Sequence, residues 1–224
     1  MSTQAILASA RPSEKKGVTW VGLFLALFGM LLIRQVFHAL WPEPTVIVTT
    51  LREISFWLSG AALVWIIRRA ERLPLTSIGI GTSPWWKSIA WGIVIAALSA
   101  MAAVVLIKLT GYGHGEGAKT FDKLPLWLVT GIVFRAGILE ELFYRGYAME
   151  RLQSLGAGRW LATAIPLAIF AVGHWTGGWA NIVIALVIGG ILAGFYLWRR
   201  DLASNMFAHT LVDFVANVLP RMFA

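Results

Sequence analysis

The stretch "GILEELFYRG" (residues 137–146) places two adjacent carboxylates and an arginine inside an apolar segment of about Leu126 to Ala148. A segment of roughly 20 apolar residues is long enough to cross the hydrocarbon core of a bilayer. Ionisable groups at membrane depth are rare, and they usually face the inside of a helix bundle. The stretch therefore predicts either a membrane helix with a polar interior face or the solvated cytoplasmic end of such a helix.

Composition favours a polytopic membrane protein. Of the 224 residues, 58% are hydrophobic and only 13% are charged, whereas a soluble domain carries about 25% charged residues. The net charge of +8 comes mainly from short basic clusters between apolar runs. This pattern indicates membrane topology rather than nucleic-acid binding. The chain has no cysteine, which excludes disulfides, thiolate nucleophiles and cysteine-ligated metals.

The hydropathy pattern predicts an all-α transmembrane bundle of about seven spans, with eight as the upper count. Tryptophans mark several span ends, as interfacial aromatic residues do. We find no internal repeat and expect one membrane domain over residues 1–224. The predicted spans cover residues 18–40, 45–67, 85–109, 126–148, 160–175, 179–198 and 202–219.

Basic residues predict the orientation of the bundle. They concentrate in the N-terminal tail (Arg11, Lys15 and Lys16) and in segments 68–87, 145–159 and 199–200. The positive-inside rule then puts the N-terminus in the cytoplasm and the C-terminus outside. The first apolar run is too long for a signal-peptide core, so we expect it to be retained as a helix. Segment 68–84 is expected to be an interfacial linker, and segment 111–119 a glycine-rich outer loop.

Spacing separates the two glutamates of the opening stretch. Glu141 and Arg145 are four residues apart with the acid first, which is the favourable order for a helical ion pair. Glu140 has Tyr144 at the same spacing instead of a cation. This pattern leaves Glu140 available to face the interior, where a desolvated carboxylate can act as a general base.

Two histidines lie at comparable depth on other predicted helices. His174 follows Phe170 by four residues, and His209 precedes Asp213 by four, so each pair shares a helical face. A rise of about 1.5 Å per residue places Glu140, both histidines and Asp213 about 10 to 21 Å from the predicted cytoplasmic ends. One buried histidine is usually a satisfied core residue, but four such groups on three helices indicate a site.

These residue types allow three functions. A glutamate-activated water could attack a carbonyl while histidines stabilise the oxyanion, which would make the protein a hydrolase. His174, His209 and a carboxylate could instead bind a metal ion that activates water. A non-catalytic scaffold that binds a partner, such as a sensor kinase, is the main alternative to catalysis, and the metal-dependent membrane hydrolase is the third possibility.

Three motifs resemble those of the CAAX protease and bacteriocin-processing (CPBP, or Abi) family of intramembrane glutamic endopeptidases. "EELFYR" (140–145) is similar to the E-E-x-x-x-R motif, "FAVGH" (170–174) to F-x-x-x-H, and "HTLVD" (209–213) to H-x-x-x-N or D. The motifs occur in the family's order, and the resemblance covers a catalytic core of about residues 126–217. Residues before this core carry no comparable signature.

The resemblance implies a role for each motif residue. Glu140 and His174 would activate the water, and His209 with Asp213 would stabilise the oxyanion. Glu141 and Arg145 would support the site, and no metal or other cofactor would be required. The implied substrate is a lipidated (CAAX-like) protein or hydrophobic peptide, cleaved near its C-terminus. We expect a multi-pass protein of a bacterial cytoplasmic membrane. Its expected partners are the substrate and the membrane lipids, and nucleic acid is not among them.

Two details give further expectations. The CAAX-processing branch has Asn at the last motif position, where this chain has Asp213. An ionised aspartate cannot donate to an oxyanion, so Asp213 is either protonated or orients His209, and we favour orientation. Gly190 and Gly194 form a G-x-x-x-G pattern that is preceded by Gly189, and this pattern predicts close packing of span 179–198 against the catalytic helices.

Overall fold

The computed structural model describes residues 16–43, 45–111, 121 and 123–223, and within these ranges the chain is helical and has no strand. The all-α prediction is therefore confirmed for the described residues. The predicted glycine-rich loop lies almost entirely outside them. Arg11 and Lys15, which contribute to the predicted orientation, also lie outside the described residues.

Among the described residues, four helices are long and apolar enough to cross a membrane. The first is α2 (Lys16–Leu40), and the second joins α3 (Val46–Trp65) to the short π-helix η1 (Ile66–Ala70). The third is α4 (Trp85–Thr110). The fourth joins the 3-10 helix η4 (Trp175–Gly177) to α9 (Gly178–Arg199). These helices coincide with four of the seven predicted spans.

The other three predicted spans are also helical. The 10-residue α6 (Leu126–Arg135) continues into a 14-residue π-helix, η3 (Ala136–Met149), and then α7 (Glu150–Ser154). The helix α8 (Arg159–Val172) has 14 residues. The helix α10 (Leu202–Asn217) has 16 residues and is followed by the 3-10 helix η5 (Leu219–Met222). The number of membrane crossings stays a prediction.

Local sequence signals set several helix ends. Thr45 begins α3 by accepting a hydrogen bond from the Val48 amide at 3.2 Å, as N-cap threonines do. Asp201 begins α10 in the same way, accepting from the Ser204 amide at 3.2 Å and from the Ser88 hydroxyl at 2.8 Å. The second bond ties the start of α10 to α4.

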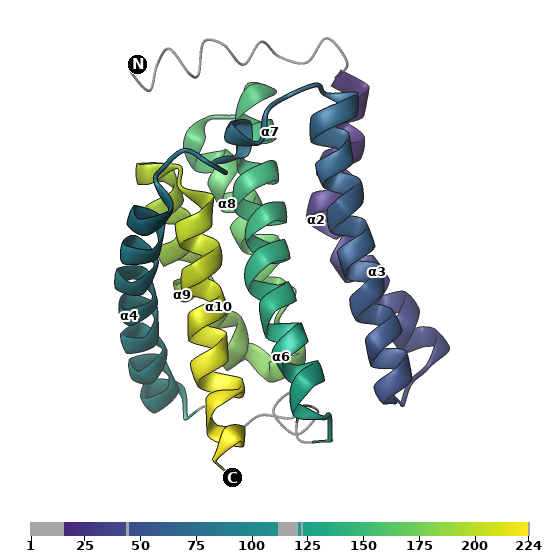
Figure 1. The fold of residues 1–224 in the computed structure, drawn as a ribbon, viewed down its shortest axis with the longest axis vertical. Coiled ribbons are helices and arrows are strands. Elements are labelled where there is room, and N and C mark those ends of the chain that lie inside the picture. The colour runs from purple at the N-terminus through teal and green to yellow at the C-terminus, as the bar shows by residue number, and fades with distance from the viewer. Residues whose placement is uncertain (1–15, 44, 112–120, 122, 224) are drawn as a thin grey trace.

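The α6–η3 helix runs through the middle of the bundle (Figure 1). The α2–α3 pair lies on one side of it, and α4, α9 and α10 lie on the other (Figure 1). The π-helix η3 packs against α2, α3, α8 and α10. Almost every residue of η3 is buried, including Phe143 and Tyr147. The segment with the paired glutamates is thus the core element of the fold.

Large apolar side chains are exposed on the outer helices. On α4 they include Ile93, Leu98, Met101 and Val105. A hydrocarbon environment solvates such a surface, whereas exposed apolar patches of this extent are unusual in soluble monomers. The exposed surface therefore fits an integral membrane protein.

The linker after η1 packs over one end of the bundle and is more than a connection. Ile78, in the 3-10 helix η2 (Leu75–Ile78), is fully buried. The Leu202 amide donates to the Gly79 carbonyl at 2.9 Å. Glu71, which follows η1, accepts hydrogen bonds from Arg151 and Tyr147, both at 2.8 Å. The linker therefore joins the ends of η3, α7 and α10.

Candidate active site

Glu141 is the centre of a buried polar network. Its carboxylate is completely inaccessible and accepts from Arg145 at 2.8 Å, as the spacing predicts. It also accepts from Asn205 at 3.1 Å and from Nδ1 of His209 at 2.9 Å. A carboxylate that accepts three hydrogen bonds inside a helix bundle is held in one position. Glu141 therefore fixes the arrangement of η3 and α10.

Glu140 is also paired, contrary to the prediction that it has no cationic partner. Arg135 donates to its carboxylate at 3.0 Å. The two residues are five apart in the sequence, and they share a face because the helix widens to a π-helix, with its i to i+5 spacing, at Ala136. The Glu140 side chain keeps 15% of its surface accessible, against 0% for Glu141. Of the two acids, Glu140 is the one that a substrate or water can reach.

Arg135 connects Glu140 to a helix outside the motif region. Its Nε donates to Glu53 of α3 at 2.8 Å, and its guanidinium lies 4.7 Å from the centre of the Phe56 ring. The sequence analysis singled out none of these three residues for a role in the site. No i, i+4 pattern marks the Arg135–Glu140 pair, and the Glu53 contact joins residues 82 positions apart.

His174 lies just beyond the end of α8 and not inside a helix as predicted, because α8 ends at Val172. Its Nδ1 is 2.8 Å from the Phe170 carbonyl oxygen. A carbonyl only accepts, so the hydrogen of this bond is on Nδ1. In a neutral ring, Nε2 is then an acceptor that can take a proton.

His209 contacts Glu141 through one ring nitrogen and Asp213 through the other, and the predicted orienting role of Asp213 stays a prediction. Nδ1 of His209 donates to Glu141 at 2.9 Å, whereas Nε2 is 3.6 Å from Asp213, longer than a hydrogen bond. The His209–Asp213 pair does share a helix face, as the spacing predicts. Asp213 therefore lies beside Nε2 of His209, while Glu141 binds the other nitrogen of the ring.

Phe170 packs against both histidines. Its ring centre is 4.6 Å from that of His174 and 6.3 Å from that of His209. The Arg145 guanidinium lies 4.3 Å from the centre of the same ring, an interaction that favours the cation. Phe170 is thus the apolar contact between the Glu141 network and His174.

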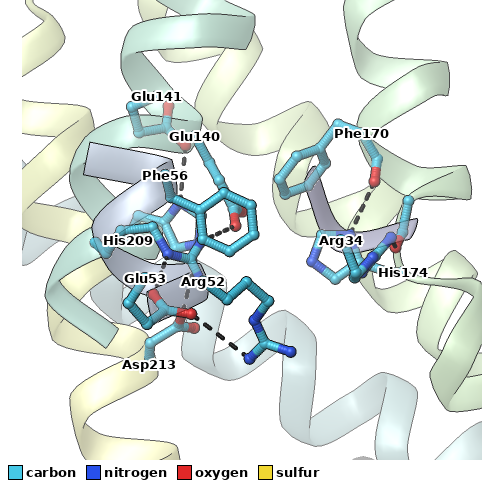
Figure 2. Close-up of polar contacts among 12 residues, drawn as sticks. Arg34, Arg52, Glu53, Phe56, Glu140, Glu141, Phe170, His174, His209 and Asp213 are labelled. Carbon is cyan, nitrogen blue, oxygen red and sulfur yellow. Dashed lines mark hydrogen bonds and ion pairs between the residues drawn. The ribbon is translucent and has the colours of Figure 1, made fainter. Parts of the chain in front are cut away.

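The structure brings the four predicted catalytic residues into one region (Figure 2). Glu140 interacts electrostatically with both His209 and His174. Asp213 interacts in the same way with both histidines and with Glu140. Figure 2 shows Phe170 and His174 facing the group that contains Glu140, His209 and Asp213. Carboxylates and imidazoles in one partly buried region are suited to proton transfer.

Of the three glycines in the predicted packing motif of α9, only Gly189 is tightly packed. A Cβ atom on Gly189 would lie 2.8 Å from Arg145 and 3.0 Å from Phe170, while Gly194 has open space around it and Gly190 would meet only Leu167, at 4.0 Å. The predicted packing of this span against the catalytic helices is found, since α9 packs against α8 and α10, but Gly189 makes the tight contact and Gly190 and Gly194 do not. Gly189 is the close contact because its carbonyl accepts from Arg145 at 3.1 Å.

The described residues contain no group of three or more histidine, aspartate or glutamate side chains placed to hold a metal ion. The candidate trio of His174, His209 and a carboxylate is not arranged as a ligand set. Each histidine uses Nδ1 in a hydrogen bond within the protein. A ring held through Nδ1 can still use Nε2, either to exchange a proton or to bind a metal ion, so these bonds do not decide between the two chemistries.

Comparison with known proteins identifies the segment that forms this site. Residues 122–215 match the family model described as type II CAAX prenyl endopeptidase Rce1-like. The match confirms the resemblance seen in the three motifs and indicates a membrane-embedded endopeptidase. Comparisons with curated proteins and with solved structures gave no match. The matched segment leaves out α2, α3 and α4.

Proposed function

Because residues 122–215 match the family model described as type II CAAX prenyl endopeptidase Rce1-like, we propose that this protein is a glutamate-dependent intramembrane endopeptidase. It hydrolyses a peptide bond near the C-terminus of a lipidated (CAAX-like) or hydrophobic peptide. The observation that carries the proposal is the difference between the adjacent acids. Glu141 is fully engaged by three donors, whereas Glu140 keeps an accessible carboxylate near both histidines.

Glu140 acts as the general base in this mechanism. It takes a proton from water while the water oxygen attacks the carbonyl carbon of the scissile bond. His174 assists by accepting a hydrogen bond from the same water through Nε2, since Nδ1 donates to the Phe170 carbonyl. When the tetrahedral intermediate collapses, the C–N bond breaks and Glu140 returns the proton to the leaving amine.

His209 stabilises the oxyanion of the intermediate. Because Nδ1 donates to Glu141, Nε2 is the nitrogen that can donate to the substrate oxygen, and it does so when the ring carries both hydrogens. Asp213, 3.6 Å from Nε2, then balances the charge of this ring. Such preorganised donors contribute a large part of hydrolytic catalysis.

The proposal includes a location and a topology. The chain forms one multi-pass domain over residues 1–224 with seven spans, a cytoplasmic N-terminus and a catalytic core over residues 126–217. Its partners are membrane lipids and a peptide or lipidated protein substrate, and we place it in a bacterial cytoplasmic membrane. The apolar outer faces of the helices and the match to a membrane protease family support the membrane location.

The test is a cleavage assay with protein purified in detergent micelles. The substrate is a synthetic peptide with an S-farnesyl cysteine three residues from its C-terminus, and the same peptide without the lipid is compared. We expect Glu140→Gln to reduce cleavage by at least about 100-fold, the lower range for loss of a general base. Glu43→Gln, the same change at an exposed position, is the matched control and should cleave normally.

Three results would contradict the proposal. Normal cleavage by Glu140→Gln would remove the assigned base. Loss of cleavage when a chelator is added would favour the metal-dependent hydrolase. A biological output that is unchanged by Glu140→Gln and by His209→Ala would favour the non-catalytic scaffold.

A further inference from the structure

Arg34 is a cation beside the catalytic histidine, and it has no acidic partner among the described residues. It lies on α2, and its Nη2 donates to the carbonyl of Gly173, the residue before His174, at 2.6 Å. Among the described residues, no carboxylate oxygen lies within 4.0 Å of its side-chain nitrogens. The one polar contact described for this guanidinium therefore leaves most of its donors available.

Arg52, on α3, is only loosely paired. Its Nη2 is 3.6 Å from Glu53, whose other oxygen accepts from Arg135 at 2.8 Å. The Nε atom of Arg52 is buried and has no hydrogen-bond partner within the described part of the chain. Figure 2 shows Arg34 next to His174 and Arg52 next to Glu53, at the edges of the catalytic group.

Cationic side chains at membrane depth are costly unless an anion or other polar groups compensate them. Glu53 and Glu140 share Arg135, and Glu141 is used by Arg145. Within the described part of the chain, Arg34 thus has no carboxylate within 4.0 Å, and Arg52 has only Glu53, at 3.6 Å. A guanidinium presents a planar set of donors that matches a carboxylate in bidentate geometry.

We propose that Arg34 and Arg52 form a subsite that binds the free C-terminal carboxylate of the substrate. This inference rests on the proposed function, because an endopeptidase that cuts near a C-terminus must accommodate that carboxylate a few residues beyond the scissile bond. Three extended residues span about 10 Å. Arg34 contacts the residue next to His174, so a short leaving segment can reach from the catalytic water to the arginines.

The subsite assigns a function to the helices outside the family match. Residues 122–215 supply the groups that activate water and stabilise the oxyanion. The helices α2 and α3 supply the charge that selects the end of a chain over an internal segment. In this scheme Arg34 and Arg52 determine specificity and take no part in proton transfer.

The test compares two peptides that differ only in the terminal group, one ending in a carboxylate and the other in a carboxamide. We expect wild-type kcat/KM to favour the carboxylate by about 10- to 100-fold, in line with charge-assisted hydrogen bonds. In the double variant Arg34→Gln/Arg52→Gln, this ratio should fall to about one, mainly through a higher KM for the carboxylate peptide.

Two further variants separate recognition from a structural effect. Arg34→Lys keeps the charge but loses the planar donor set, so part of the preference should remain. Arg69→Gln, the same change at an exposed position on η1, should keep the full preference. Thermal unfolding of each variant in detergent verifies that the compared proteins are folded.

The outcomes distinguish this inference from the proposed function. Equal cleavage of both peptides by the wild type would overturn the subsite and leave the peptidase intact. An undiminished preference in the double variant would also overturn it. If phosphatidylglycerol vesicles abolished the preference and phosphatidylcholine vesicles did not, the arginines would be assigned to an anionic lipid headgroup and the substrate subsite would be overturned. Cleavage of neither peptide would overturn the proposed function, and the subsite with it.

Discussion

At the residue scale, Glu140 and Glu141 are adjacent but have different surroundings. Glu141 has three donors and no accessible surface. Glu140 shares Arg135 with Glu53 and stays partly accessible. Glu141 is therefore suited to hold the site together, and Glu140 is suited to react.

Substitution of the two acids should have different effects on the free energy of unfolding. Glu141→Gln leaves the buried Arg145 without its carboxylate, and we expect a loss of about 3 to 5 kcal/mol in unfolding free energy. Glu140→Gln should cost less, because Arg135 keeps Glu53 as a partner. Denaturation in mixed micelles measures both values. Equal losses for the two variants would contradict this division of roles.

Asp213 gives a second prediction at this scale. Because Glu141 orients His209, the negative charge of Asp213 is not needed to hold the ring. We expect Asp213→Asn to keep cleavage within about tenfold of wild type, a smaller change than the loss of an acid or base group causes. Cleavage rates at saturating peptide test this prediction. Complete loss of activity would show that the carboxylate itself is required.

At the element scale, the contact between η3 and α10 positions the catalytic groups. Gly137 lies where these helices meet, and a Cβ atom there would be 2.1 Å from Thr210 Oγ1 and 2.8 Å from Thr210 Cα. Backbone atoms cannot move aside as a flexible side chain can. The distance between the glutamates and His209 therefore depends on a glycine at residue 137.

A pair of glycine substitutions in one helix tests this contact. Gly137→Ala should cost about 1 to 3 kcal/mol through overpacking, and it should lower cleavage by displacing η3 from α10. Gly131→Ala is the matched control, because a Cβ atom at that position meets nothing within 4 Å. If Gly137→Ala had wild-type stability and activity, the contact would not set the site geometry.

Spacing rules predicted only some of the side-chain contacts that these helices make. The Glu141–Arg145 and His209–Asp213 pairs follow the four-residue rule, and both are found. The Arg135–Glu140 pair was missed because it requires a π-helix, which no simple periodicity indicates. Asn205 was missed as well, although its place four residues before His209 puts it on the same face.

At the scale of the whole molecule, hydropathy predicted where the helices lie but not how they pack. All seven predicted spans correspond to helices, because long apolar runs bounded by Pro, Gly and Trp leave few alternatives. Contacts such as Arg34 with Gly173 join residues 139 positions apart. Such pairs depend on the packing of separate helices, and no local pattern in the chain encodes them.

Topology is the prediction for the molecule as a whole. With seven spans and basic residues concentrated on one side, the N-terminus should be cytoplasmic and the C-terminus outside. Reporters that are active on only one side of the membrane, fused to each end of the chain, can measure this. If both ends gave the same signal, the number of crossings would be even and the seven-span count wrong.

The separation of α2 and α3 from the matched segment has a consequence for how such an enzyme can change. Mutations in these two helices can alter the charge near the site, while the residues proposed to transfer protons stay the same. A mutant library restricted to α2 and α3, selected on peptides with different end groups, should yield new preferences more often than one restricted to η3 and α10. The same division would allow related proteins to differ in substrate preference while they keep the same catalytic chemistry.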